Sequence, residues 1–396
     1  MSRKLSLCVV LFCLTSFALA QNPVPHSGSA SQPSSSTVQV VYVVDGVNIL
    51  TYNVDPQTLY ATQVGTPLNL SGTFYWLLPS PNDHFLYVFT FDVNSKKHLS
   101  VYATDASGVP HAPATEVINA NALYNLQFDP QANFLYATYL FPSGPYNNLY
   151  EIRRFVVDPG TGRISQSQVE AKYTLPNGSG GTTSCGLAFF GFNASGSKLY
   201  DYVDCGFHGG SSATYYERTV NLQTGALGSD VKIFGWNDTN GAFDGVTFVG
   251  NLMVDFVSPN NYQQGVNSVN IYPLVPNTSK LLLQCTAQML EACGYAGGAV
   301  VHPSGKYVFM TISQDSVQID KIELGQKKIV DTGNYIPYRF GQFSPDGTLV
   351  YGIYNSNPGY FIEIFGFNVS TSAVTTNGYV ISVPSGLDPY FVAQRY

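Results

Sequence analysis

The sequence predicts an all-β protein, a seven-bladed β-propeller closed by pairing of the N- and C-terminal strands in one blade. Three observations carry this prediction. A phrase made of a turn and a following strand, usually with a tyrosine, recurs along the chain, most clearly at 128–136, 301–308 and 343–351. Its copies start roughly 40 to 60 residues apart, which is the period of a four-stranded blade. The two ends of the chain are incomplete in complementary ways. The first tyrosine strand has no such turn before it. In the other repeats a further strand precedes the turn, and the last copy of that strand has no tyrosine strand after it.

Each repeat divides into strands a to d, counted outward from the central channel. Strand b is the tyrosine strand, and strand c follows it with period-two alternation of apolar and polar residues. The expected copies of strand b are residues 41–44, 86–89, 135–138, 199–202, 252–255, 307–310 and 349–352.

Strand a precedes the turn in each repeat. Its expected copies are residues 74–78, 123–128, 186–192, 244–249, 297–301, 339–343 and 389–393. The last copy must complete the blade that begins at residue 41, because this pairing leaves no exposed inner edge. The a–b turns then lie on one face, here called the bottom, and the d–a and b–c loops lie on the opposite, top face around the channel mouth.

The N-terminal residues are expected to lie outside the fold. A basic start and an apolar run end at the small-x-small site 18–20, so residues 1–20 are interpreted as a secretory signal peptide. Residues 21–37 are rich in Ser and Pro and are interpreted as a flexible leader. The propeller is expected over 38–396, in a secreted or periplasmic protein. No later apolar run reaches the roughly 20 residues that span a bilayer, so no transmembrane anchor is predicted.

The charge composition restricts the expected partners. The chain carries 18 basic and 25 acidic residues, and only 11% of its residues are charged. No basic patch suited to nucleic acid is present. The surface must therefore be covered by Ser, Thr, Asn, Gln, Gly and Tyr, a composition typical of adaptable binding surfaces. We expect a monomer that binds a small molecule, a glycan or a cell-surface protein.

Four cysteines remain after removal of the expected signal peptide, and an even number in an oxidising compartment predicts two disulfides. Three pairings are possible. The expected topology places Cys185 and Cys205 on the top of one blade, and Cys285 and Cys293 at the two ends of one d–a loop. It therefore favours Cys185–Cys205 and Cys285–Cys293.

The repeated Pro-(Asp/Ser)-Gly-x-x-x-Tyr phrase, together with the segment 156–162 (Val-Val-Asp-Pro-Gly-Thr-Gly), resembles the YVTN-repeat, lactonase-type seven-bladed propellers. That family is similar to propeller-type 6-phosphogluconolactonases. The resemblance covers nearly all of residues 38–396 and implies the fold, with lactone hydrolysis as one activity. Family members usually carry Arg-x-x-His entering strand a and an acidic segment after strand b. Here 338–341 keeps Arg339 without the histidine, and 311–315 has lost most of the acidic residues.

Candidate catalytic residues are the charged ones among the positions that open each strand a. A lactone hydrolase needs a base or a metal to activate water and a cation to hold the developing oxyanion. Asp244 or Asp388 is expected to supply the base, and Arg339 the cation. The alternative is an inter-blade ion pair that lines a water-filled channel. No nucleophile elbow, phosphate loop or zinc motif is present, so neither a cofactor nor a metal is predicted.

Candidate ligand-binding residues lie on the same face. Tyr75, Tyr124 and Tyr295 open strands a, and His208 falls in a b–c loop. His302, in contrast, falls in an a–b turn on the bottom face and is expected to be structural. The b–c segments are expected to be long loops rich in Tyr, Asn, Gly and Pro, and they are residues 139–148, 203–214, 256–267 and 353–360.

Two functions remain open from the sequence. The first is a non-catalytic binding or surface-associated module that uses the top-face loops, motivated by their Tyr and Asn content and by the missing histidine and acidic segment. The second is a lactonase-like hydrolase of a lactone or related ester at the channel mouth. Turnover assays on the wild type and on Arg339→Ala separate them, because turnover that the substitution abolishes excludes binding alone.

Overall fold

The structure is a computed structural model. It describes residues 39–119, 122–143, 146–165, 167–178, 183–193, 195–207, 210–238, 241–249, 252–259, 268–273, 283–285, 299–313, 316–326, 328–356, 359–383 and 390–395. The expected signal peptide and leader lie outside these residues and stay predictions.

The described strands pair into seven four-stranded antiparallel sheets. The sheet that holds both termini contains β28 (Tyr390–Arg395), β1 (Gln39–Asp45), β2 (Asn48–Val54) and β3 (Ala61–Asn69). The next contains β4 (Thr73–Pro79), β5 (Phe85–Phe91), β6 (Lys97–Thr104) and β7 (Pro110–Asn119). It is followed by the sheet of β8 (Leu123–Phe128), β9 (Phe134–Pro142), β10 (Asn147–Val156) and β11 (Gln168–Pro176).

The other sheets follow in chain order. These are β12 (Ser184–Phe192), β13 (Lys198–Phe207), β14 (Gly210–Val220) and β15 (Leu227–Asp238); then β16 (Gly241–Val249), β17 (Leu252–Pro259), β18 (Ser268–Pro273) and β19 (Leu283–Cys285). The last two are β20 (Ala299–Val301), β21 (Tyr307–Ser313), β22 (Ser316–Glu323) and β23 (Lys328–Ile336), and β24 (Arg339–Phe343), β25 (Leu349–Ser356), β26 (Gly359–Phe367) and β27 (Val374–Val383). A short 3₁₀ helix, η2 (Leu324–Gln326), precedes β23.

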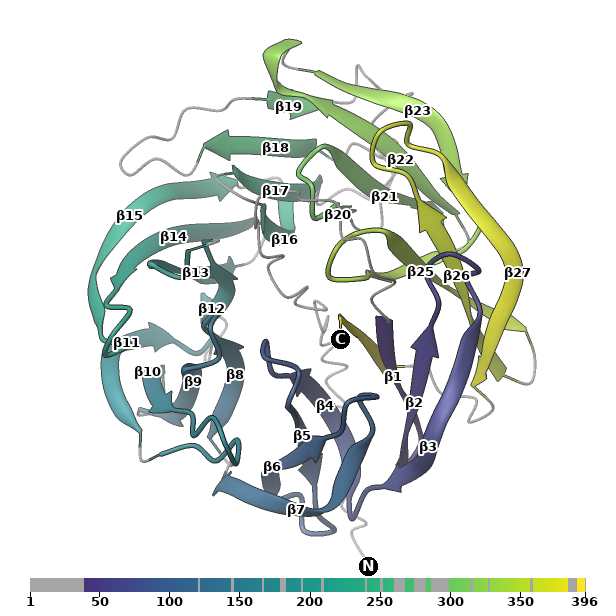
Figure 1. The fold of residues 1–396 in the computed structure, drawn as a ribbon. Helices are drawn as coiled ribbons and strands as arrows, with labels where there is room; N and C mark the ends of the chain where they lie inside the picture. Colours follow the sequence, from purple (N-terminus) through teal and green to yellow (C-terminus); the bar gives the residue numbers. More distant parts are fainter. Residues whose placement is uncertain are drawn as a thin grey trace, which may run out of the picture.

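The chain is therefore an all-β β-propeller, with its sheets arranged around a central axis (Figure 1). The inner edge strand is the first strand of the sheet in chain order, except in the sheet of the termini, where it is β28. The predicted pairing of the chain ends is confirmed. β1 runs antiparallel to β28, with Val41 opposite Ala393 and Tyr42 opposite Val392. The C-terminal strand thus supplies the innermost strand of the sheet that the N-terminal strand begins.

The turn of the repeated phrase is explained by its first residue. That residue accepts a hydrogen bond from a backbone N–H five positions later, as Asp129 does from Phe134 at 2.6 Å and Ser344 does from Leu349 at 2.9 Å. Polar side chains that bond their own backbone in this way favour tight turns. The fourth residue has a positive φ, +72° at Gly347, which explains the glycine of the phrase.

The tyrosine of strand b has a role that depends on the neighbouring sheet. Its hydroxyl donates a hydrogen bond to a backbone carbonyl in the c–d turn of the next sheet. Among the described residues, four such bonds run from Tyr42 to Gly108 (2.7 Å), Tyr87 to Gly162 (2.5 Å), Tyr136 to Gly225 (2.5 Å) and Tyr307 to Val369 (2.9 Å). We call these the inter-sheet tyrosine bonds. Each bond satisfies a hydroxyl that lies between two sheets. The tyrosine ring can therefore be buried there without leaving an unpaired polar atom.

The hydrophobic core lies between neighbouring sheets. Between the sheets β4–β7 and β8–β11, for example, Tyr87 and Phe89 pack with Leu126, Phe128 and Leu135, all of them buried. Because a neighbouring sheet packs on each side, both faces of an inner strand are buried. Strand b is therefore a continuous apolar run.

The expectation of long b–c loops is wrong where the structure describes them. β13 and β14 pair from Val203–Thr214 out to Phe207–Gly210, so 203–214 is mostly an extended hairpin. β9 likewise continues to Pro142, and β25 continues to Ser356. In both of these hairpins the backbone pairing also runs on beyond the expected strand ends, to Pro142 opposite Asn148 and to Ser356 opposite Gly359. Of 256–267, the part beyond Pro259 lies outside the described residues.

Candidate functional site

Three of the sequence-predicted residues lie at irregular positions in strand a. The register of β4 with β5 shifts between Phe74 and Trp76, and that of β8 with β9 shifts between Leu123 and Asn125. Tyr75 and Tyr124 are therefore the extra residues of two β-bulges. Asp244 occupies the same position in β16. Bulges redirect side chains and are common beside functional sites, so both tyrosines are directed away from the regular pleat.

Tyr124 is the central group of the described top face. Its side chain is 54% exposed, and its ring meets the ring of Tyr150 edge-on, with centroids 6.2 Å apart. Partial burial raises the pKa of Tyr124, and the nearby Tyr75 and Asp204 raise it further. The phenol is consequently neutral at physiological pH and is available as a hydrogen-bond donor.

Asp204 lies near the top end of β13, opposite Gly186 of β12 and Ala213 of β14. Burial raises the pKa of its carboxyl to about 6, although a hydrogen bond from the Cys205 backbone acts in the opposite direction. Its Oδ1 atom is buried and has no hydrogen-bond partner among the described residues. An incompletely paired carboxyl with a raised pKa near the top end of strand b is a candidate proton-transfer group.

The surroundings of Asp204 belong to the same group of tyrosines. Tyr202 lies two residues earlier and therefore on the same face of β13. Burial raises the pKa of Tyr202, and the charges of Asp204 and Tyr124 add to the effect. We define Tyr75, Tyr124, Tyr150, Tyr202 and Asp204 as the rim site. Its members come from three consecutive sheets, β4–β7, β8–β11 and β12–β15.

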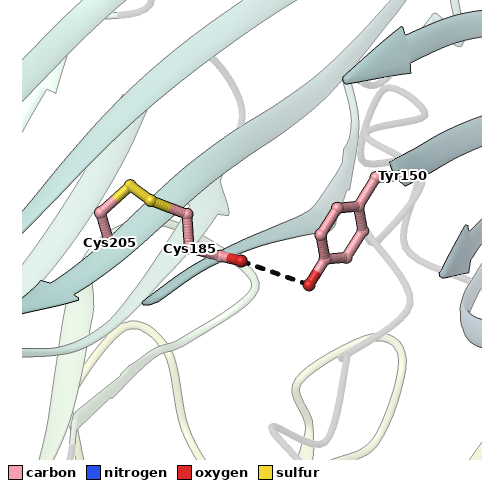
Figure 2. The surroundings of a disulfide bond; sticks show 3 residues. All are labelled: Tyr150, Cys185 and Cys205. Carbon is pink, nitrogen blue, oxygen red and sulfur yellow. Dashed lines mark hydrogen bonds between the residues drawn. A yellow bond between two sulfur atoms is a disulfide. The ribbon is translucent and has the colours of Figure 1, made fainter. Parts of the chain in front are cut away.

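The predicted Cys185–Cys205 disulfide is confirmed, and it lies directly beside Asp204. It joins β12 to β13, with the two Cα atoms 4.0 Å apart. The Tyr150 hydroxyl donates a hydrogen bond of 3.3 Å to the Cys185 carbonyl, as Figure 2 shows. This bond ties the sheet β8–β11 to the cross-linked strand pair. The backbone that carries Asp204 is thereby held by a covalent bond on its own sheet and by a hydrogen bond from the neighbouring one.

The residue opposite Asp204 is Gly186, which has no side chain and leaves space beside the Asp204 carboxyl. A Cβ atom added at Gly186 would meet one heavy atom within 4 Å among the described residues, the Tyr150 hydroxyl at 3.9 Å. Any larger residue at this position would fill the space next to the carboxyl. The local sequence thus provides an acidic group, a neighbour without a side chain, and a phenol from the adjoining sheet.

Asp201, three residues earlier, shows what a structural carboxylate looks like in the same strand. It is completely buried, and burial raises its pKa. However, it accepts hydrogen bonds from Arg218 at 3.1 Å and from Tyr173 at 3.2 Å. The ion pair lies within the sheet β12–β15, and the hydrogen bond from Tyr173 of β11 ties it to the neighbouring sheet. Asp204 has no comparable cation among the described residues.

Of the other sequence-predicted residues, Arg339 is not brought into the rim site. Arg339 opens β24 opposite Ile353, three sheets beyond β12–β15 in ring order. For Asp244 only the backbone is described, and the same holds for Cys285 in β19. His208, Tyr295, Asp388 and Cys293 lie outside the described residues, so the Cys285–Cys293 pairing stays a prediction.

His302 lies on the bottom face, as expected, and is fully buried. Its Nε2 donates to the Gly347 carbonyl at 2.8 Å and its Nδ1 accepts from the Ser304 backbone at 3.0 Å, which requires a neutral ring. Burial lowers its pKa to about 4. This histidine therefore links two neighbouring a–b turns.

Two further properties concern the described part of the chain. Within it, no three His, Cys, Asp or Glu side chains gather in a way that suits a metal ion. It also holds no helix long and apolar enough to cross a bilayer.

Comparison with known proteins identifies the fold. The chain matches the crystal structure of the periplasmic gluconolactonase of Pseudomonas aeruginosa with a TM-score of 0.56 and 13% identity, over 90% of this chain and 99% of that one. The fold is that of a lactonase-type β-propeller. Two proteins provisionally described as 6-phosphogluconolactonases are similar. The one from Bacteroides uniformis ATCC 8492 has a TM-score of 0.55 and 15% identity, over 90% of this chain and 100% of the other.

The second, from Bacteroides fragilis NCTC 9343, has a TM-score of 0.54 and 16% identity, over 91% of this chain and 99% of the other. No family profile and no curated protein matches the sequence. At these identities the likeness concerns the fold, and the activity must be argued from the rim site.

Sequence reasoning missed Asp204, because it considered only the positions that open strand a. A signal was nevertheless present. The family resemblance associates acidic residues with the end of strand b, and Asp204 lies near the end of that strand in the sheet β12–β15. Its position opposite a glycine depends on strand register, which the sequence does not specify.

Proposed function

We propose that this protein is an exported lactone hydrolase whose reaction takes place at the rim site. The observation that carries the proposal is Asp204, a carboxyl with a raised pKa and an unpaired oxygen beside the neutral phenol of Tyr124. The lactonase-type fold supports the same reaction class. The disulfide supports a location outside the cytoplasm, because such bonds persist in oxidising compartments.

The chemistry assigns one role to each group. The Asp204 carboxylate removes a proton from the water that attacks the lactone carbonyl, and a pKa of about 6 leaves it mostly ionised at neutral pH. The Tyr124 hydroxyl donates a hydrogen bond to the developing oxyanion. The ring ester C–O bond then breaks, and the leaving alkoxide takes up the proton to give an open-chain hydroxy acid.

We propose further that the sheets act as seven blades of one ring.

The test is hydrolysis of glucono-δ-lactone after subtraction of the spontaneous rate. Asp204→Asn is expected to lower kcat by about 10²-fold or more, the usual contribution of a general base. In the wild type, kcat/KM is expected to rise with pH through about 6, because the base acts only when ionised. Asp45→Asn is the control, since Asp45 also ends a b strand, in the sheet of the termini. It should leave turnover unchanged.

Three results would contradict the proposal. They are wild-type turnover that Asp204→Asn does not lower, equal losses in both variants, and no turnover above the spontaneous rate. In the last case, Tyr124-dependent binding of a small molecule or glycan would favour the non-catalytic binding module instead, because half-exposed tyrosines are suited to ligand contact.

A further inference from the structure

Tyr75 extends the rim site on the side away from Asp204. Its side chain is 48% exposed, yet its ring is fixed by two aromatic neighbours of β5. The centroid of Phe89 lies 5.2 Å away and that of Phe91 lies 5.0 Å away. A half-exposed ring that is already packed against other rings presents a flat apolar surface to a ligand with little loss of conformational entropy on binding.

Tyr75 and Asp204 lie on either side of Tyr124. Both raise the pKa of Tyr124, and the three residues come from consecutive sheets in the order Tyr75, Tyr124, Asp204. Lys97 of β6 fixes the first two sheets relative to each other. Its ammonium donates a hydrogen bond of 3.2 Å to the carbonyl of Leu123, the residue before Tyr124. The spacing of the two tyrosines is therefore built into the fold.

The proposed reaction uses only part of this row. Asp204 and Tyr124 are sufficient to hydrolyse one lactone ring, and Tyr75 has no part in that chemistry. An exposed tyrosine ring on a surface with few charged groups is suited to the apolar C–H face of a pyranose, while its hydroxyl bonds the sugar hydroxyls. The position of Tyr75 next to Tyr124 places such a sugar directly beside the lactone.

We infer that the substrate is the δ-lactone of an aldonic acid that carries a further neutral glycosyl residue, and that this residue stacks on Tyr75. The inference rests on the proposed function and specifies its substrate class. Water adds to the lactone carbonyl and the ring ester bond breaks, so the product is the corresponding glycosyl aldonic acid. The glycosidic bond stays intact.

The experiment compares cellobiono-δ-lactone with glucono-δ-lactone, which lacks the second sugar. The wild type is expected to show a kcat/KM about tenfold higher for cellobiono-δ-lactone, the scale of one aromatic contact. Tyr75→Ala should lower kcat/KM for cellobiono-δ-lactone about tenfold more than for glucono-δ-lactone, and Tyr75→Phe should retain most of the preference. Tyr60→Ala is the control, because Tyr60 is 56% exposed but precedes β3, outside the rim site.

Binding of the two corresponding lactams, measured by calorimetry, separates this inference from the proposed function. A Tyr75-dependent preference for cellobionolactam in the absence of turnover would support the glycosyl subsite and refute hydrolysis. Equal kcat/KM values and equal lactam affinities would refute the subsite and leave hydrolysis standing. A Tyr75→Ala variant that loses both substrates alike would also refute the subsite.

Discussion

Among the described residues, the interfaces between sheets are of two kinds. Four of them carry an inter-sheet tyrosine bond, in which a buried hydroxyl reaches the c–d turn of the next sheet. The closing interface, between the sheet β24–β27 and the sheet that holds both termini, has the same tyrosine without the bond. Tyr351 is completely buried, and its hydroxyl has no partner among the described residues.

The closing interface replaces this bond in two ways. Asn377 of β27 donates a hydrogen bond of 2.5 Å to the Thr58 carbonyl in the c–d turn, and Gln39 of β1 donates one of 3.1 Å to Asp346. In addition, the Leu59 side chain packs into the hydrophobic core between these two sheets. At the equivalent position, two of the turns that accept a tyrosine bond have a glycine with a positive φ, Gly162 and Gly225. The difference shows that the regular interfaces are specified by a repeated polar contact, whereas the closing one depends on packing and on exposed or partly exposed side chains.

The largest expected effect comes from the turn glycines. Gly225 and Gly378 have nearly the same backbone, with φ of +70° and +74°. A Cβ at Gly225 would lie 2.6 Å from the Phe134 ring and 2.7 Å from Arg154, whereas at Gly378, in β27 of the closing interface, it would meet nothing within 4 Å. We expect Gly225→Ala to cost about 3 kcal/mol and Gly378→Ala about 1 kcal/mol in free energy of unfolding, measured in urea. Equal losses of unfolding free energy in the two variants would mean that backbone strain alone sets the cost of the added Cβ atom.

Acid should weaken the interface that contains His302 more than the closing one. The pKa of His302 is lowered from 6.5 to about 4, so the folded state binds fewer protons than the unfolded state between these values. Its contribution is complete above pH 6.5 and is lost as the pH falls towards 4, by about 2 to 3 kcal/mol. Urea unfolding between pH 7 and 4 should show a smaller pH dependence for His302→Gln. An unchanged slope would contradict the assignment of a neutral ring.

The smallest effect tests the tyrosine bonds themselves. Tyr136→Phe removes a buried donor and leaves the Gly225 carbonyl unsatisfied, so we expect a loss of about 1 to 2 kcal/mol in free energy of unfolding. Tyr351→Phe removes a hydroxyl without a described partner and should be neutral or slightly stabilising. The same urea titration measures both. A cost at Tyr351 equal to that at Tyr136 would remove the distinction between the two kinds of interface.

The positions of the inner strands were predictable from sequence because local chemistry sets them. The phrase begins with a side chain that bonds its own backbone and ends in an apolar strand, and both features lie within a few residues. The partner of the tyrosine was not predictable. Gly225 lies 89 residues from Tyr136, and no local pattern connects them.

The candidate site was predictable in part for the same reason. Tyr75 and Tyr124 open strands that the phrase locates, and the structure places them at the top face as expected. The role of Asp204 depends on its register with Gly186 and on the burial of its carboxyl, which are properties of the assembled sheet. The lengths of the b–c hairpins were misjudged because tyrosine and asparagine occur both in loops and in strand pairs.

The direction of the tyrosine bonds has a consequence for how the chain matures. Each hydroxyl reaches forward to a carbonyl between 62 and 89 residues later in the sequence. A newly made sheet therefore cannot satisfy its own buried phenol until its successor exists. The first sheet, for its part, lacks its innermost strand until β28 has been made.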